Sequence, residues 1–120
     1  MKNRVRWDED NGCVRFELHG PVPLADAEML IAGLEQHLQG KPRRLLLVDH
    51  TDSPEGLPSE TRAYFKRRTG ELGLERLAFF GVSNVVRIAT RVIIAITRPS
   101  AQVKFFATEA EAISWLQERS

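Results

Sequence analysis

The segment that follows the apolar run Leu45–Val48 carries the densest group of side chains that could do chemistry: Asp49, His50, Asp52 and Glu55. Carboxylates and imidazoles are common metal ligands and common general acids and bases. The group lacks any recognised metal-ligand spacing. Neighbours in an extended segment point to opposite sides, which argues against pairing of Asp49 with His50. Turn formation and helix capping are therefore the favoured roles. An enzyme or metal site that uses Asp49, His50 and Asp52 is an alternative.

The sequence shows no pattern typical of a catalytic nucleophile. No Gly-x-Ser-x-Gly elbow occurs, and the single cysteine, Cys13, falls in a predicted hairpin rather than at a helix start. One cysteine also excludes a disulfide framework and a multi-cysteine metal site. We therefore expect no catalytic residue, no cofactor and no resident metal.

Two other segments carry candidate binding residues. Ser83 and Asn84 follow an apolar run, where backbone N–H groups at a strand-to-helix junction can accept an anion, although capping the helix is the favoured role. Arg62 and Lys66 are four residues apart in a predicted helix. They therefore share a face that suits an acidic partner, with a solvated helix face as the simpler interpretation.

Hydrophobic periodicity predicts the elements that position these residues. Alternation on both sides of Asp10-Asn11-Gly12 predicts a β-hairpin with one buried face. Apolar residues from Leu24 to Leu38 recur at helical spacing, and Gly40 and Pro42 end that helix. The continuous apolar run Leu45–Val48 is typical of a strand buried on both faces.

The second half of the chain alternates helical and strand patterns. Ser59 is expected to cap one helix, and the capping-box spacing of Thr108 and Glu111 predicts the start of the last one. Residues 85–97 are rich in β-branched side chains but are predicted to be helical because their basic residues fall on one helical face. The predicted elements are helix 59–71, strand 77–80, helix 85–97, strand 102–106 and helix 108–118.

This order predicts an α/β fold in one domain that spans residues 1–120. An N-terminal β-hairpin is followed by α-β-α-β-α-β-α, and the mostly parallel sheet is covered by helices through right-handed crossovers. The hairpin supplies an antiparallel edge. In an open parallel sheet, ligands bind beyond the carboxyl ends of the strands, so a site is expected there.

Several segments in this order carry a family likeness. They are the strand that ends in Asp49, the stretch Asp52-Ser53-Pro54-Glu55-Gly56-Leu57, the strand 77–81, and the ending Phe105-Phe106-Ala107-Thr108 with Trp115-Leu116. Together they resemble the STAS domains, and more closely their SpoIIAA-like branch. The resemblance implies a fold related to the CRAL-TRIO lipid-binding domains. It also implies binding of a partner protein or a small ligand rather than catalysis.

The resemblance also bears on phosphorylation. Classical members are anti-sigma factor antagonists, in which a partner kinase modifies a serine within an Asp-Ser-Ser-Gly-Leu stretch. When this chain is aligned on Gly56-Leu57, Glu55 occupies that position; when it is aligned on Asp52-Ser53, Ser53 matches the first serine, which is not the modified one. We therefore expect Asp49 to Leu57 to be a recognition segment without the phosphorylation switch.

The function that we expect is that of a non-catalytic regulatory or protein-interaction domain of the STAS/SpoIIAA-like type. A carrier of a small apolar or amphipathic ligand, lined by Leu57, Tyr64, Phe65, Phe79 and Phe80, is the first alternative. The enzyme or metal site is the second. The expected binding residues are Asp49, His50, Asp52, Ser53, Glu55, Gly56, Arg62, Lys66, Ser83 and Asn84.

Composition limits the partners and the compartment. The 120 residues carry a net charge of +1, so no general field favours nucleic acid, which is not an expected partner. No run of about 18 apolar residues occurs, so no membrane span is expected. The start MKNRVRWDED has no apolar signal stretch, and a cytoplasmic location is expected. A homodimer formed through the edge strand of the hairpin is left as an alternative, and the charges at Arg4, Arg6, Arg15 and Glu17 are expected to discourage open-ended strand pairing.

Overall fold

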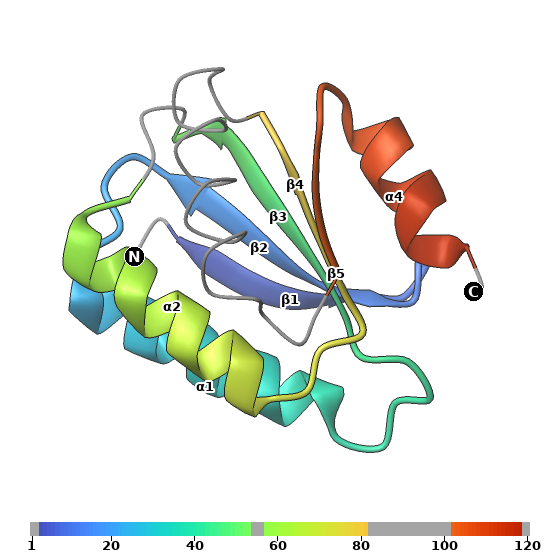
Figure 1. Cartoon of the computed structure of the whole chain (residues 1–120), viewed down its shortest axis with the longest axis horizontal. Helices are drawn as coiled ribbons and strands as arrows, with labels where there is room; N and C mark the ends of the chain where they lie inside the picture. The colour runs from blue at the N-terminus through green and yellow to red at the C-terminus, as the bar shows by residue number, and fades with distance from the viewer. Residues whose placement is uncertain (1–2, 54–56, 82–101, 119–120) are drawn as a thin grey trace.

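The computed structural model describes residues 3–53, 57–81 and 102–118. One sheet contains five strands in the order β1-β2-β3-β4-β5 (Figure 1). β1 is antiparallel to β2, and each later strand is parallel to the one before it. The elements are β1 (Arg4–Asp8), β2 (Cys13–His19), α1 (Leu24–Leu38), β3 (Leu45–Asp52), α2 (Ser59–Glu71), β4 (Arg76–Phe80), β5 (Gln102–Phe106) and α4 (Glu109–Gln117). The predicted α/β class and the hairpin edge are confirmed.

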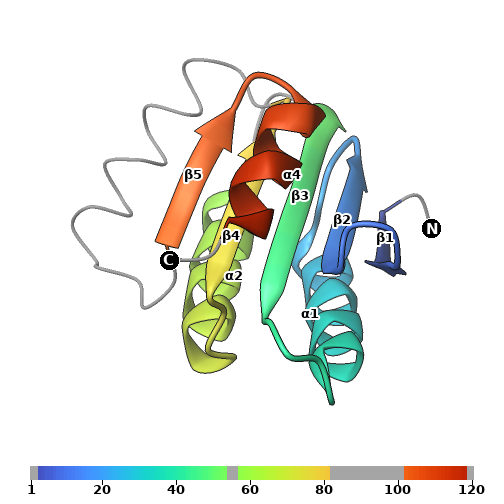
Figure 2. The ribbon, with the colours of Figure 1, turned by 90° about the vertical axis from the view of Figure 1, so that its right-hand side faces the viewer.

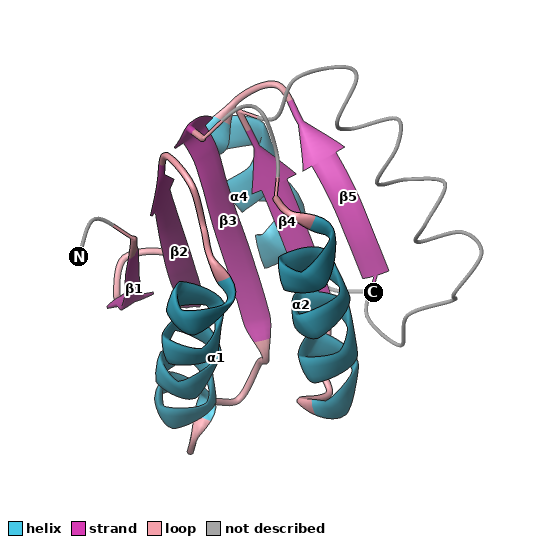
Figure 3. Cartoon of the chain, turned by 90° about the vertical axis from the view of Figure 1, so that its left-hand side faces the viewer, coloured by secondary structure: helices cyan, strands magenta, loops and turns pink. Residues whose placement is uncertain are grey.

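The two faces of the sheet are covered by different helices. α1 and α2 lie side by side on one face (Figure 3), and α4 lies on the other (Figure 2). Alternation along β2 serves both faces, because successive side chains of a strand point to opposite sides. The core beneath α1 and α2 includes Val14, Phe16, Leu18, Leu46 and Val48. The core beneath α4 includes Cys13, Leu45, Leu47, Ala78, Phe80, Ala112, Trp115 and Leu116.

The tight hairpin turn and the cap of α4 by Thr108 were predicted from the sequence, and both are confirmed. Gly12 has a φ of 65°, and its N–H donates to the carbonyl oxygen of Asp8 at 2.8 Å. Thr108 caps α4, since its Oγ1 accepts from the N–H of Glu111 at 3.3 Å and donates to the Glu111 carboxylate at 2.9 Å. The side chain of Thr108 thus caps the helix as expected, whereas the Glu111 carboxylate accepts from the Thr108 hydroxyl rather than completing a capping box through the backbone N–H.

Three expectations need correction or lie beyond the described part of the chain. β3 runs to Asp52 rather than ending at Asp49, so His50, Thr51 and Asp52 also belong to the strand. Ser59 is the first residue of α2 and not its cap; Pro58 holds the cap position and no side chain caps the helix. The expected helix 85–97 lies outside the described residues.

Partner strands explain why β3 continues into polar sequence. Asp49 pairs with Glu17 on one side and with Phe80 on the other. After a register shift, Asp52 pairs with His19. Strand ends are therefore fixed by the neighbouring backbones, which supply hydrogen-bond partners whatever the side chains are.

Gly81, directly after β4, lies close to the backbone of Thr51 in β3 at the same edge of the sheet. Its φ is 80°, and a Cβ at this position would lie 2.6 Å from the backbone nitrogen of Thr51. Only glycine combines that backbone conformation with that contact.

Candidate functional site

Asp49 and His50 point to opposite faces of the sheet. The His50 side chain is buried, with its ring centroid 5.6 Å from that of Phe79, which stacks in turn on Phe105 at 4.9 Å. The Asp49 carboxylate accepts a hydrogen bond from the N–H of Thr51 at 2.8 Å. The sequence argument against a dyad of these adjacent residues is thus supported by their geometry.

His50 fixes the turn at the end of β3. Its Nδ1 lies 3.3 Å from the carbonyl oxygen of Ser53, whose own N–H donates to the carbonyl oxygen of His50 at 2.9 Å. Burial lowers the pKa of His50, and the opposing effects of the Ser53 carbonyl and of the Asp49 charge are smaller. The imidazole is therefore neutral at pH 7 and serves the turn rather than proton transfer.

Ser53 ties β3 to the loop that precedes α1. The residue is 5% exposed, and its Oγ donates to the carbonyl oxygen of Gly20 at 2.7 Å. A kinase would have to break this hydrogen bond to reach the hydroxyl. Glu55 and Gly56, the next expected site residues, lie outside the described residues, as do Ser83 and Asn84.

Asp52 pairs with His19, which was not among the expected site residues. The Nδ1 of His19 lies 3.0 Å from Oδ2 of Asp52. Both residues line an open pocket of about 490 Å³, together with Arg4, Gly20 and Pro21. The signal that could have found His19 is positional: it ends a strand parallel to β3, so the two carboxyl ends share one edge.

A buried asparagine positions the wall of this pocket. Asn3 is 3% exposed, and its Oδ1 accepts from the N–H of His19 at 2.7 Å. Its Nδ2 donates to the carbonyl oxygen of Pro21 at 3.2 Å and to Asp26 at 2.8 Å. One side chain therefore links the start of β1, the end of β2 and the first turn of α1.

Four basic residues follow one another closely on α2, and one of them is neutralised. Arg68 pairs with Glu35 of α1 at 3.4 Å and with Glu71 at 3.2 Å. The four residues, which we call the α2 basic group, are Arg62, Lys66, Arg67 and Arg68.

The rest of the α2 basic group has no acidic partner within the described residues. Arg62 donates to Oγ of Ser59 at 3.3 Å. The Arg67 guanidinium lies over the ring of Tyr64, 5.5 Å from its centroid, and Lys66 is exposed. The structure thus places Arg62 and Lys66 on α2, whereas His19 and Asp52 end strands of the sheet.

Comparison with known proteins identifies a family. Residues 11–120 match the family described as "Domain of unknown function (DUF7793)". The chain belongs to this family. No curated protein matches it.

A solved structure similar to this DUF7793 chain is that of an uncharacterized protein from the DUF3478 family with a SpoIIAA-like fold, from Shewanella loihica PV-4. The identity is 24%, the match covers 95% of this chain and 91% of the other, and the TM-score is 0.70. The SpoIIAA-like fold that the sequence resemblance implied is therefore confirmed.

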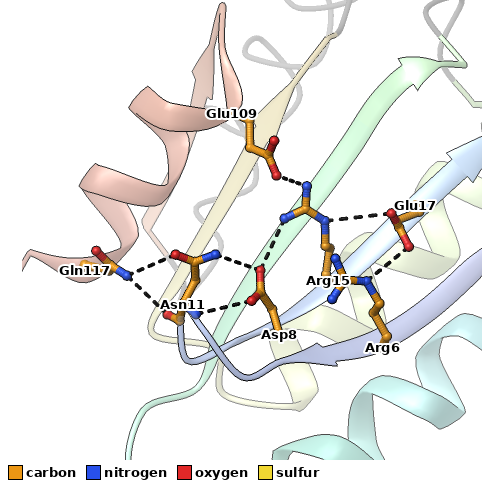
Figure 4. Close-up of polar contacts among 7 residues, drawn as sticks. All are labelled: Arg6, Asp8, Asn11, Arg15, Glu17, Glu109 and Gln117. Carbon is orange, nitrogen blue, oxygen red and sulfur yellow. Dashed lines mark hydrogen bonds and ion pairs between the residues drawn. The ribbon is translucent and has the colours of Figure 1, made fainter.

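The hairpin of this DUF7793 chain carries a second charged group, centred on a buried arginine (Figure 4). The Arg15 side chain is 7% exposed; its Nη1 lies 3.3 Å from Asp8, and its Nη2 contacts Glu109 at the start of α4. Burial raises the pKa of Asp8, but hydrogen bonds from Asn11 and nearby arginine charges outweigh this and lower it overall. Asn11 also accepts from Gln117 at 3.5 Å, so the network fastens both ends of α4 to the hairpin.

The other chemistries raised by the sequence find little support in the geometry. Among the described residues, no group of three histidine, cysteine, aspartate or glutamate side chains is placed to hold a metal. Burial raises the pKa of Cys13 to about 11, so it is a poor nucleophile. The described part of the chain also contains no helix of the length and hydrophobicity needed to cross a membrane.

The side chains assigned to a ligand carrier belong to the interior. Leu57, Tyr64, Phe65 and Phe79 pack against the core beneath α1 and α2, and the Phe65 ring contacts that of Phe16 at 5.9 Å. Phe80 lies on the opposite face, in the core beneath α4. These aromatic rings are therefore already in contact with other core side chains.

Proposed function

We propose that this DUF7793 chain is a non-catalytic interaction domain that binds an acidic partner protein through α2. The observation that carries the proposal is the α2 basic group. Arg62, Lys66 and Arg67 have no ion pair among the described residues, whereas Arg68 is matched by two carboxylates. Like charges without ion-pair partners on one helix repel one another. The approach of an acidic surface lowers their electrostatic free energy and so favours binding.

The setting of α2 supports a recognition role. Thr61 is the only residue of the helix with its side chain fully buried, and its Oγ1 donates to the carbonyl oxygen of Val22 at 2.9 Å. Seven of its thirteen residues are exposed, and Lys66 and Arg67 are among those that a partner can reach. Because the chain has a net charge of only +1, attraction to an acidic protein would be local and would weaken with salt.

A catalytic role has less support from the same geometry. The candidate acid and base at Asp49 and His50 face apart, and the buried imidazole is held in a turn. The SpoIIAA-like fold is compatible with a regulatory domain of the STAS type, but a fold does not assign a function. The proposal therefore depends on the surface of α2.

A capture experiment tests the proposal. The immobilised chain is incubated with native lysate, and retained proteins are quantified by mass spectrometry for wild type and for Lys66→Glu/Arg67→Glu. A control variant, Lys41→Glu/Lys104→Glu, changes the net charge equally at cations that lie outside α2. We expect the α2 variant alone to lose an acidic partner. Equal retention by all three proteins would refute the proposal.

A further inference from the structure

Three ionisable side chains lie on neighbouring strands at one edge of the sheet. Arg4 begins β1, His19 ends β2 and Asp52 ends β3. These side chains, with Gly20 and Pro21, line the open pocket of about 490 Å³. That volume falls within the range of small-molecule sites, about 300–1,000 Å³.

The two charged ends of the pocket have unused hydrogen-bonding capacity. His19 engages Oδ2 of Asp52, and Oδ1 has no side-chain partner among the described residues, so it can accept another donor. Arg4 makes no hydrogen bond or ion pair with any described residue, although its register partner is Glu17, which pairs with Arg6 at 3.2 Å instead. A residue whose guanidinium carries five N–H donors therefore lines the same pocket as a carboxylate.

The backbone between these two charges is held in place. Gly20 donates to the carbonyl oxygen of Asp52 at 2.9 Å and accepts from Ser53, while Asn3 holds His19 and Pro21. A ligand would therefore meet a preorganised wall and would not have to order it on binding.

The charge arrangement selects a class of ligand. Asp52 repels a simple anion, and Arg4 repels a simple cation, whereas a dipolar ligand of zero net charge satisfies both ends. Adjacent strands are about 4.8 Å apart, so β1 and β3 lie about 10 Å apart on either side of β2. The long side chain of Arg4 can span part of that distance.

We propose that this pocket binds small zwitterions of the α-amino acid class. The carboxylate of the ligand pairs with Arg4, and its ammonium group donates to Asp52, beside the histidine that orients that carboxylate. This site is separate from the α2 basic group and does not depend on the proposed partner protein.

Titration of the ¹⁵N-labelled full chain, followed by two-dimensional NMR, tests the proposal. The probes are L-alanine and its two half-ligands, propionate and ethylamine. We expect saturable shifts of the amides of Arg4, His19, Gly20 and Asp52 with L-alanine, and much weaker responses to either half-ligand. No saturable shift with L-alanine, or an equal response to propionate, would overturn the assignment.

Variants distinguish the pocket from general surface binding. Arg4→Gln and Asp52→Asn each remove one charged contact and should weaken L-alanine binding about tenfold or more. Lys104→Gln removes an exposed cation on β5 and should leave the affinity unchanged. If Lys104→Gln weakened binding as much as Arg4→Gln, the pocket would not be the site.

Discussion

The two faces of the sheet hold their covering helices by different interactions. Beneath α1 and α2, β2 presents Val14, Phe16 and Leu18 to an apolar core. On the face of α4, the same strand presents Arg15, Glu17 and His19, and Arg15 is buried in a network of ion pairs. The comparison teaches that one face is held by apolar burial, whereas the other combines an apolar core with charges that orient α4 and leaves polar side chains available at the sheet edge.

The largest effect is expected on the apolar face. Phe16→Ala removes a ring that is 2% exposed and leaves a cavity, so the free energy of unfolding should fall by about 3–5 kcal/mol. Chemical denaturation measures the loss. Met29→Ala, at a side chain that is 41% exposed, serves as the control and should change stability by less than about 0.5 kcal/mol.

A smaller loss is expected on the charged face. Arg15→Met leaves the buried Asp8 carboxylate without its cation and should cost about 2–3 kcal/mol. The cost is moderated because Asp8 keeps its hydrogen bonds from Asn11, and because the Glu109 side chain is 45% exposed.

A double variant sharpens this reading of the charged face. Arg15→Met/Asp8→Asn removes the orphaned charge and should recover part of the loss measured for Arg15→Met. If Arg15→Met alone unfolded like wild type in denaturant, the network would not stabilise α4.

The apolar face also contains a titratable group, His50, which should make stability depend on pH. Burial lowers its pKa below the ordinary value of 6.5, so in acid the unfolded chain binds a proton that the folded chain does not. The contribution is complete above pH 6.5 and is lost as the pH falls from 6.5 to the lower pKa of the folded state. Unfolding free energies measured at several pH values should show this decline.

The variant His50→Gln isolates that effect. Its stability should lack the part of the decline that wild type shows just below pH 6.5. Parallel curves for the two proteins would mean that His50 is protonated equally in both states.

The smallest effect is expected at the start of α4. Thr108→Ala removes the capping hydrogen bonds with Glu111 and should lower the thermal stability by an amount equivalent to about 1 kcal/mol. Ser114→Ala, at an exposed position within α4, should not destabilise the protein. Equal melting temperatures for Thr108→Ala and wild type would contradict the capping role.

The fold followed from the sequence because its signals are local. The turn at Gly12, the helix 24–38 and the cap at Thr108 each depend on short-range spacing, and the parallel pairing follows from the alternation of strands and helices. The end of β3 did not follow, since it is set by pairing with β2, which reaches Asp52, rather than by its polar side chains.

The site was predicted only in part, because it depends on register between distant segments. The carboxyl edge of β3 was expected, and Asp52 was named. Its partner His19 was missed, because no sequence pattern reports the register shift that brings the two residues 3.0 Å apart. The cation at Arg4 was read as a charge that protects the edge strand, and only the pocket suggests a ligand for it.

The most direct measurement is the affinity of the purified, captured partner as a function of salt concentration, for wild type and for Lys66→Glu/Arg67→Glu. We expect wild-type affinity to fall as salt rises, because the unmatched cations of α2 provide the attraction. The variant should bind more weakly at low salt and should depend less on salt. Equal affinities with equal salt dependence would contradict recognition through α2.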